Sequence, residues 1–214
     1  MVLGSKMDNL KIYKDQMDSN IIKSPVWLSG NAGSSNPKKL AIVFIDGNNL
    51  YHNLKTIVKP SEIDFKKLAD FICSKFNLNL KEIRYYNSIP DISNNEITYH
   101  KHLNFLSDLE KQDIIVKTRK LTKLKKEKGV DVLIASDIIR NTIIDKKCDV
   151  CILISGDADF IPVMEIIKDL KKEVITAMVL NGYARELMQG RFRFLILKDK
   201  DILDNCLKNN KGLK

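Results

Sequence analysis

Aromatic residues, long apolar runs and secretion signals are all scarce or absent in this sequence of 214 residues. Aromatic side chains make up 7% of it, so a nucleic-acid platform of exposed, stacked rings is not indicated. No apolar run approaches the ~20 residues that are needed to span a bilayer. The first twenty residues lack the apolar centre of a signal peptide. We therefore expect a cytoplasmic protein that does not associate with membranes.

Cysteine is also scarce, and its spacing excludes two further classes of protein. Four cysteines are too few and too scattered for a disulfide scaffold. Cys148 and Cys151 form a CxxC pair, but Cys151 lies inside an apolar run and not at a helix start, where a redox pair would stand. No second CxxC and no histidine pair completes a zinc site. We expect these two cysteines, with Cys73 and Cys206, to be buried and unreactive.

Several common catalytic patterns are missing as well. The sequence contains no evident Ser-His-Asp or Cys-His arrangement, and its three histidines do not indicate a histidine-based metal site. The stretch "DGNNL" after the first apolar run is neither a G-x-G-x-x-G motif nor a P-loop. We therefore expect no organic cofactor, and neither an NTPase nor a dehydrogenase is indicated.

The positive charge of the chain is concentrated in one segment. The formal net charge is +9, and the segment "KTRKLTKLKKEK" at 117–128 carries seven positive charges against one acid. Such a block attracts polyanions, because phosphate contacts supply most of the non-specific affinity for nucleic acids. A solvated loop without a partner is an equally good reading of this segment alone. The predicted RNA contacts are Lys120, Lys123, Lys125, Lys126 and Lys128.

Short apolar runs alternate with amphipathic segments from residue 39 onward. The predicted strands span 39–46, 80–89, 113–119, 148–155 and 172–180, with a candidate edge strand at 192–197. The predicted helices span 64–76, 96–111, 129–145, 159–170, 183–190 and 201–208. This alternation indicates right-handed crossovers and a doubly wound, mainly parallel sheet of the α/β class. We expect a flexible tail at 1–38, one domain at 39–198, and a C-terminal helix and tail at 199–214.

Acidic residues follow two of these strands, at the end where functional groups of such sheets gather. In the common strand order 3-2-1-4-5, the first and fourth strands are neighbours at the switch point. Asp46 ends the first strand and Asp157 follows the fourth, so this order places them across one crevice. Asp131, in the first turn of the helix that leads into the fourth strand, can point at the same crevice.

Each acid also has a structural reading. Asp46 stands in good turn chemistry, and Asp159 can cap the helix that follows it. Asp137 lies some 120° around the helix from Asp131, so it either supports the site from behind or lies on a polar face. Several acids at one crevice repel one another unless a cation binds. An all-oxygen cluster suits Mg²⁺ or Mn²⁺.

Three motifs carry a resemblance to a known family: "FIDGNNLY", "KGVDVLIASD" and "ILISGDADFIPVMEIIKDL". Together they resemble the NYN domain, in its LabA-like branch, of the PIN-like nuclease superfamily, over residues 40–197. The resemblance implies a Rossmannoid sheet of order 3-2-1-4-5 and a carboxylate site that binds divalent metal. By position, it implies a catalytic set of Asp46, Asn48, Asp131, Asp157 and Asp159, with Ser155 and Asp137 at supporting positions.

The function implied is hydrolysis of RNA phosphodiester bonds. Asp46, Asp131 and Asp157 would hold one or two Mg²⁺ or Mn²⁺ ions, and bound ions of this kind activate a water and stabilise the leaving oxygen. The alternative is a non-catalytic RNA-binding or interaction module on the same fold, and a homo-oligomer is compatible with either. A phosphatase that uses the DxD of "GDAD" is less well supported, because the first strand lacks a nucleophilic DxD. The stretch "GRFRFL" departs from the family pattern, since it lacks an acid that many members have there.

Overall fold

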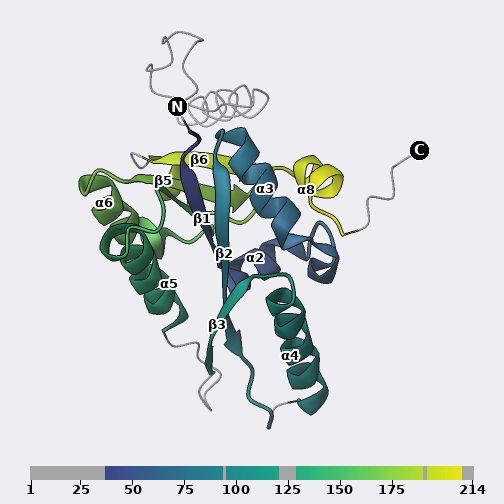
Figure 1. The fold of residues 1–214 in the computed structure, drawn as a ribbon. Helices are drawn as coiled ribbons and strands as arrows, with labels where there is room; N and C mark the ends of the chain where they lie inside the picture. The colour runs from purple at the N-terminus through teal and green to yellow at the C-terminus, as the bar shows by residue number, and fades with distance from the viewer. Residues whose placement is uncertain (1–36, 94, 121–128, 190–191, 209–214) are drawn as a thin grey trace, which may run out of the picture. The chain divides into compact units, whose positions relative to one another are not determined.

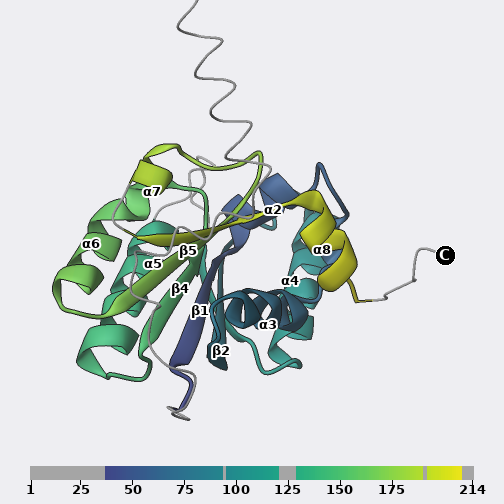
Figure 2. The same ribbon diagram turned by 90° about the horizontal axis from the view of Figure 1, so that it is seen from above.

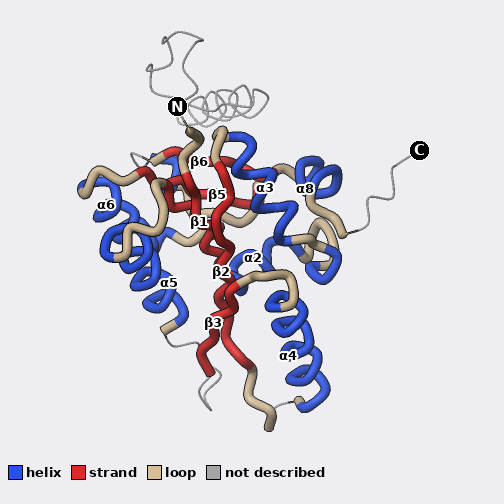
Figure 3. The backbone as a smooth tube through the Cα atoms, viewed as in Figure 1, coloured by secondary structure: helices blue, strands red, loops and turns tan. Residues whose placement is uncertain are grey.

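A computed structural model describes residues 37–93, 95–120, 129–189 and 192–208. Strands and helices alternate along this part of the chain (Figure 3). The tail predicted at 1–38 lies almost wholly outside the described residues. Among the described residues, no helix combines the length and the apolar character that a membrane crossing requires.

Six parallel strands form one sheet in the order β3-β2-β1-β4-β5-β6 (Figure 1). Their bounds are β1 Leu40–Asp46, β2 Asn79–Ile89, β3 Ile115–Lys120, β4 Val150–Ile154, β5 Glu173–Val179 and β6 Arg193–Leu197. The predicted order 3-2-1-4-5 is confirmed, and β6 extends the sheet beside β5. All five residues of β4, and all of β1 after Leu40, are buried, as expected for central strands covered on both faces.

Helices cover both faces of the sheet (Figure 2). One face carries α2 Gly47–Leu54, α3 Phe65–Lys75, α4 Glu96–Glu110 and α8 Asp199–Asn205. The other carries α5 Val130–Ile139, α6 Ile161–Asp169 and the short α7 Glu186–Gln189. Each face has its own buried apolar cluster. The doubly wound α/β class is therefore confirmed.

Two local features differ from the prediction. The helix expected over 129–145 ends as an α-helix at Ile139 and continues as a π-helical turn over Arg140–Ile144. In addition, α2 begins directly after β1, where the sequence indicates only a turn. Helix α2 starts with Gly-Asn-Asn, which has low helix propensity, so packing and the cap at Asp46 override the local preference.

Candidate active site at the carboxyl ends of β1 and β4

Asp46, the last residue of β1, is a buried carboxylate held at the start of α2. Its Oδ1 accepts a hydrogen bond from the Asn49 backbone N–H at 3.1 Å, which is the usual role of an N-cap aspartate. Its Oδ2 accepts a hydrogen bond from the Ser155 hydroxyl at 3.0 Å. The side chain thus joins the end of β1 to the chain leaving β4, and only 4% of Asp46 is exposed.

The glycine after Asp46 explains how α2 can start so close to the sheet. A Cβ on Gly47 would lie 2.4 Å from the Tyr85 ring and 2.6 Å from the Tyr86 carbonyl oxygen. Only glycine fits this contact between α2 and β2. Gly47 therefore lets the Asp46 cap form at the strand end itself.

A second short hydrogen-bonded chain connects Ser155 to Asp157 and Asp159. The Asp157 backbone N–H donates to the Ser155 hydroxyl oxygen at 3.2 Å. The Asp159 backbone N–H donates to the Asp157 carboxylate at 2.9 Å, so Asp157 caps the 3-10 turn Ala158–Phe160. The interpretation of Asp159 as the cap is wrong, because this extra turn precedes α6 and moves the cap two residues upstream. Asp159 itself is exposed to solvent.

The electrostatic environment of Asp46 links three acids from three different elements. Burial raises the pKa of Asp46 from 3.8 to about 6, against the hydrogen bonds from Asn49 and Ser155, and the charges of Asp131 and Asp157 raise it further. Asp131 stands exposed in the first turn of α5, and Asp157 is half-buried. Of the predicted acids, Asp131 and Asp157 are therefore close enough to act on the Asp46 carboxylate at this edge of the sheet.

The side chains at this edge can be compared with the ligands that a divalent cation requires. Within the described ranges, histidine, cysteine, aspartate and glutamate side chains form no group of three or more that could hold a metal ion. The donors present are nevertheless all oxygen, and the neighbouring acids disfavour the charged form of Asp46. Mg²⁺ keeps several waters and uses only one or two carboxylates, so binding of this ion does not require a group of three such side chains.

Asn49, which the sequence analysis did not single out, is the hub of the framework around Asp46. Its side-chain Oδ1 accepts hydrogen bonds from the Gly156 backbone N–H at 2.9 Å and from Asn53 Nδ2 at 3.0 Å. Asn48, which was singled out, donates to the Ser88 hydroxyl at 3.2 Å. The spacing of Asn49 and Asn53, one helical turn apart, is the signal that could have indicated the hub.

The loop after β5 closes against the same framework. Asn53 Nδ2 donates to the Gly182 carbonyl oxygen at 3.0 Å, and the Ala184 N–H donates to the Gly156 carbonyl oxygen at 2.8 Å. A Cβ on Gly156 would lie 1.9 Å from the Gly182 carbonyl oxygen. The segments after β4 and β5 are therefore packed backbone to backbone, the Asn49 and Asn53 side chains join them to α2, and this packing fixes the residues directly before Asp157.

Comparison with known families now identifies the domain. The sequence matches the NYN domain over residues 40–197. The chain belongs to the NYN domain family. NYN domains belong to the PIN-like nuclease superfamily, which suggests a nuclease activity in general.

Two other comparisons bear on this NYN domain. A crystal structure of a protein of unknown function from Vibrio parahaemolyticus is similar in fold, with a TM-score of 0.55 and 19% sequence identity. The match covers 82% of this chain and 100% of that one. No curated protein matches the sequence.

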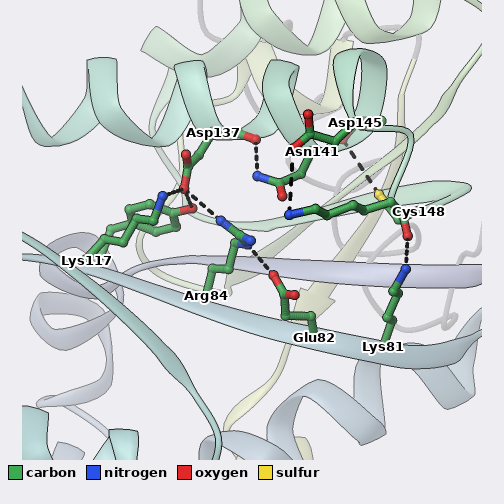
Figure 4. A network of polar contacts seen from close by, with 11 residues as sticks. Lys81, Glu82, Arg84, Lys117, Asp137, Asn141, Asp145 and Cys148 are labelled. Carbon is green, nitrogen blue, oxygen red and sulfur yellow. Dashed lines mark hydrogen bonds and ion pairs between the residues drawn. The ribbon is translucent and has the colours of Figure 1, made fainter.

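Asp137 of the NYN domain lies in a network of polar contacts beneath α5 (Figure 4). Its Oδ2 accepts hydrogen bonds from Arg84 at 3.0 Å and from the Tyr86 hydroxyl at 2.7 Å, and forms an ion pair with Lys117 at 2.6 Å. Burial acts to raise the pKa of Asp137, but the bonds from Lys117 and Tyr86 and the charges of Lys117 and Arg84 outweigh it. The pKa is consequently below its usual range.

The basic segment can be placed only in part. Lys117, its first residue, points to Asp137. The backbone of Lys120 ends β3, but its side chain lies outside the described residues, as do Lys123, Lys125, Lys126 and Lys128. Their predicted contacts with RNA stay a prediction.

The four cysteines of the chain are buried, as predicted. Cys73, Cys148, Cys151 and Cys206 are all free and buried. Burial raises the pKa of the Cys73 thiol to about 11 and that of the Cys206 thiol to about 12. It raises the pKa of Cys148 and Cys151 as well. A raised pKa disfavours the thiolate, which is the nucleophilic and metal-binding form; the absence of reactivity stays a prediction.

Proposed function

We propose that this NYN domain is a divalent-metal-dependent ribonuclease that hydrolyses RNA phosphodiester bonds at the crevice between β1 and β4. The observation that carries the proposal is the buried Asp46 carboxylate at the topological switch point. It is joined to Ser155 across the crevice, and the charges of Asp131 and Asp157 act on it. Ligands of open α/β sheets bind at this position, outside the carboxyl ends of the strands.

Asp46, Asp131 and Asp157 are the residues proposed to hold Mg²⁺ or Mn²⁺. A bound ion would supply an activated water and stabilise the charge that develops on the phosphate and leaving oxygens. The cost of keeping several acids charged side by side supports this assignment, since a cation removes that cost. Burial is the main cause of the raised pKa of Asp46 and the charges of Asp131 and Asp157 add to it; a bound cation would favour the charged form of all three acids.

The remaining residues are proposed to orient these acids. Ser155 donates to Asp46 Oδ2 and accepts from the Asp157 N–H, so one hydroxyl joins the Asp46 carboxylate to the backbone of Asp157. Asn49 holds the opposite oxygen of Asp46 through its N–H. Asn48 and the exposed Asp159 stay proposed contacts to the substrate phosphate or to a water.

RNA is the proposed substrate, with Lys120, Lys123, Lys125, Lys126 and Lys128 as the proposed contacts to its phosphates. The support is the charge of the segment and its position between β3 and the helix that bears Asp131. Positive charge of this kind attracts a polyanion, and bound metal ions would neutralise the reacting phosphate. Three further points stay predictions. The three motifs support membership of the LabA-like branch, and we also predict a cytoplasmic location and a homo-oligomer.

A cleavage assay on a mixture of single-stranded and structured RNA tests the proposal. The wild-type chain is incubated with Mg²⁺, Mn²⁺ or EDTA, beside Asp157→Asn and the control Asp169→Asn. Asp169 is exposed at the other end of α6, so its variant should retain activity. We expect cleavage that requires metal and is lost only in Asp157→Asn. RNA binding without cleavage under every metal would instead support the alternative, a non-catalytic RNA-binding or interaction module.

A further inference from the structure

One buried oxygen ties helix α5 to two strands of the sheet. Asp137 on α5 is 5% exposed, and its Oδ2 contacts Arg84 and Tyr86 on β2 and Lys117 on β3. Figure 4 shows the Asp137 side chain directed from the helix toward Arg84 and Lys117. Charge-assisted hydrogen bonds of this kind are short and directional, so the contact defines an orientation as well as a distance.

The donors to Asp137 are themselves held in place. Tyr86 and Lys117 are register partners in neighbouring strands, and Arg84 lies two residues before Tyr86, on the same face of β2. Arg84 is also paired with Glu82 through its Nε, and its side chain is 7% exposed. Two cations therefore balance two acids beneath the helix, and the tether is anchored in the sheet.

Helix α5 needs such a tether, because its apolar pattern does not select one face. Seven of its ten residues, in the stretch "VDVLIASDII", are apolar, and they lie nearly all around the helix. Ile134 and Ile138 are fully buried, whereas Val132 is 69% exposed. Apolar packing alone leaves rotations of such a helix close in energy, and a buried polar contact can select one of them.

The rotation of α5 decides where Asp131 points. Asp131 and Asp137 belong to one rigid helix, so any rotation at Asp137 is transmitted to Asp131. A side-chain atom about 5–6 Å from the helix axis moves about 2 Å when the helix turns by roughly 20°. A displacement of that size is enough to remove a ligand from a cation.

We propose that Asp137 is a positioning residue: its contacts with Arg84, Tyr86 and Lys117 fix the rotation of α5 and so hold Asp131 at the crevice beside Asp46. The inference rests on the proposed function, since it gives Asp131 a cation to bind. Asp137 itself touches neither the cation nor the RNA.

A double-mutant cycle on Mn²⁺ affinity tests the inference, with binding followed by the loss of the free Mn²⁺ signal in electron paramagnetic resonance. Asp137→Asn in the full-length chain should weaken Mn²⁺ binding by about 10- to 100-fold, as for other residues that orient a ligand. In an Asp131→Asn background, the same change should alter Mn²⁺ affinity by less than about 2-fold, because Asp137 acts on the cation only through the Asp131 carboxylate, which this background lacks. Ile138→Val removes one buried methyl group beside Asp137 and leaves the network intact, so its Mn²⁺ affinity should equal that of the wild type.

Tyr86→Phe provides a milder variant for the same cycle. It deletes only the hydroxyl that donates to Asp137, and it should weaken Mn²⁺ binding by a few-fold in the wild-type background alone. Hydrogen exchange of the α5 amides should be faster in both Asp137→Asn and Tyr86→Phe. If Asp137→Asn does not fold, the cycle built on Tyr86→Phe decides the question.

The outcomes separate the two proposals. Equal losses of Mn²⁺ affinity with and without Asp131, or an equal loss in Ile138→Val, would overturn the positioning role and leave the ribonuclease proposal standing. A wild-type chain that neither binds Mn²⁺ nor cleaves RNA would overturn both. Coupling to Asp131, with faster exchange of α5, supports the positioning role.

Discussion

Asp46 and Asp137 are the same residue type at almost the same burial, 4% and 5% exposed, yet their surroundings are opposite. In the part of the chain that the structure describes, Asp46 accepts hydrogen bonds from neutral groups, the Asn49 N–H and the Ser155 hydroxyl. Asp137 contacts two cations and a tyrosine. Accordingly, the pKa of Asp46 is raised to about 6 and that of Asp137 is lowered.

The difference separates two uses of a buried carboxylate. Burying a charge is unfavourable unless it is paired, and at Asp137 the pairing is supplied by the protein itself. At Asp46 the neighbouring charges are those of other acids, so the proposed cation would supply the pairing. A buried acid in a negative field is typical of a site that awaits a cation, whereas a buried acid among cations holds the fold in one arrangement.

The largest effect expected from this comparison is on catalysis. Asp46→Asn should reduce RNA cleavage by on the order of 1000-fold or more, because it removes a metal ligand. Asp137→Asn should be milder, at about 10- to 100-fold. Single-turnover cleavage at one fixed, subsaturating Mg²⁺ concentration measures both. Equal losses in the two variants would contradict the distinction drawn between the two aspartates.

Deletion of the Asp137 side chain should have the largest effect on stability. Asp137→Ala leaves Arg84 and Lys117 without their shared partner beneath α5, and breaking a buried pair costs about 3–5 kcal/mol. Urea unfolding at pH 7 measures the change in the free energy of unfolding. Asp108→Ala is the matched control, since its pair with Lys111 is on the surface and its loss should change stability by less than about 0.5 kcal/mol.

Asp46→Asn should have the opposite effect and stabilise the metal-free protein. A carboxyl whose pKa is raised in the folded state stabilises the fold below its unfolded pKa of 3.8 and loses that contribution as pH rises through about 6. The amide of the variant does not ionise, so the variant should be more stable than the wild type by up to about 3 kcal/mol at pH 8. The two should be similar at pH 4. Thermal unfolding in EDTA across this range checks the sign, and a variant less stable than wild type at pH 8 would refute it.

A smaller effect is expected from the hub at Asn49. Asn49→Ala leaves the buried Gly156 N–H without its acceptor, which should cost about 1–3 kcal/mol of unfolding free energy. Metal-dependent cleavage should fall as well, because the chain before Asp157 loses its anchor. Asn48→Ala is the control, since it removes only the bond to Ser88 and should be closer to wild type in stability.

Much of the fold follows from local pattern in the sequence. Strands β1 to β5, the helix stripe of α3 and the strand order were predicted, because burial of central strands on both faces requires apolar runs and crossovers have one hand. The start of α2 was not predicted, since it depends on the close contact of Gly47 with Tyr85. The cap role of Asp157, assigned wrongly to Asp159, depends on a single 3-10 turn that no periodicity signals.

The candidate site was predicted in its composition and not in its contacts. The sequence placed Asp46, Asp131 and Asp157 at one edge, because parallel strands end together at the switch point. For Asp137 it left two positions open, one behind the site and one on a polar face of the helix. The network around Asp137 joins it to Arg84 and Tyr86, 53 and 51 residues away along the chain.

The sequence by itself determined the alternation of elements, the order of the strands and the edge at which the acids gather, since these depend on short-range pattern and on the handedness of the chain. The tertiary structure alone decided which acid is buried among acids and which among cations. The physical reason is that the charged state of a buried carboxylate is set by neighbours within a few ångströms, and for Asp46 and Asp137 the decisive neighbours lie on other strands and helices.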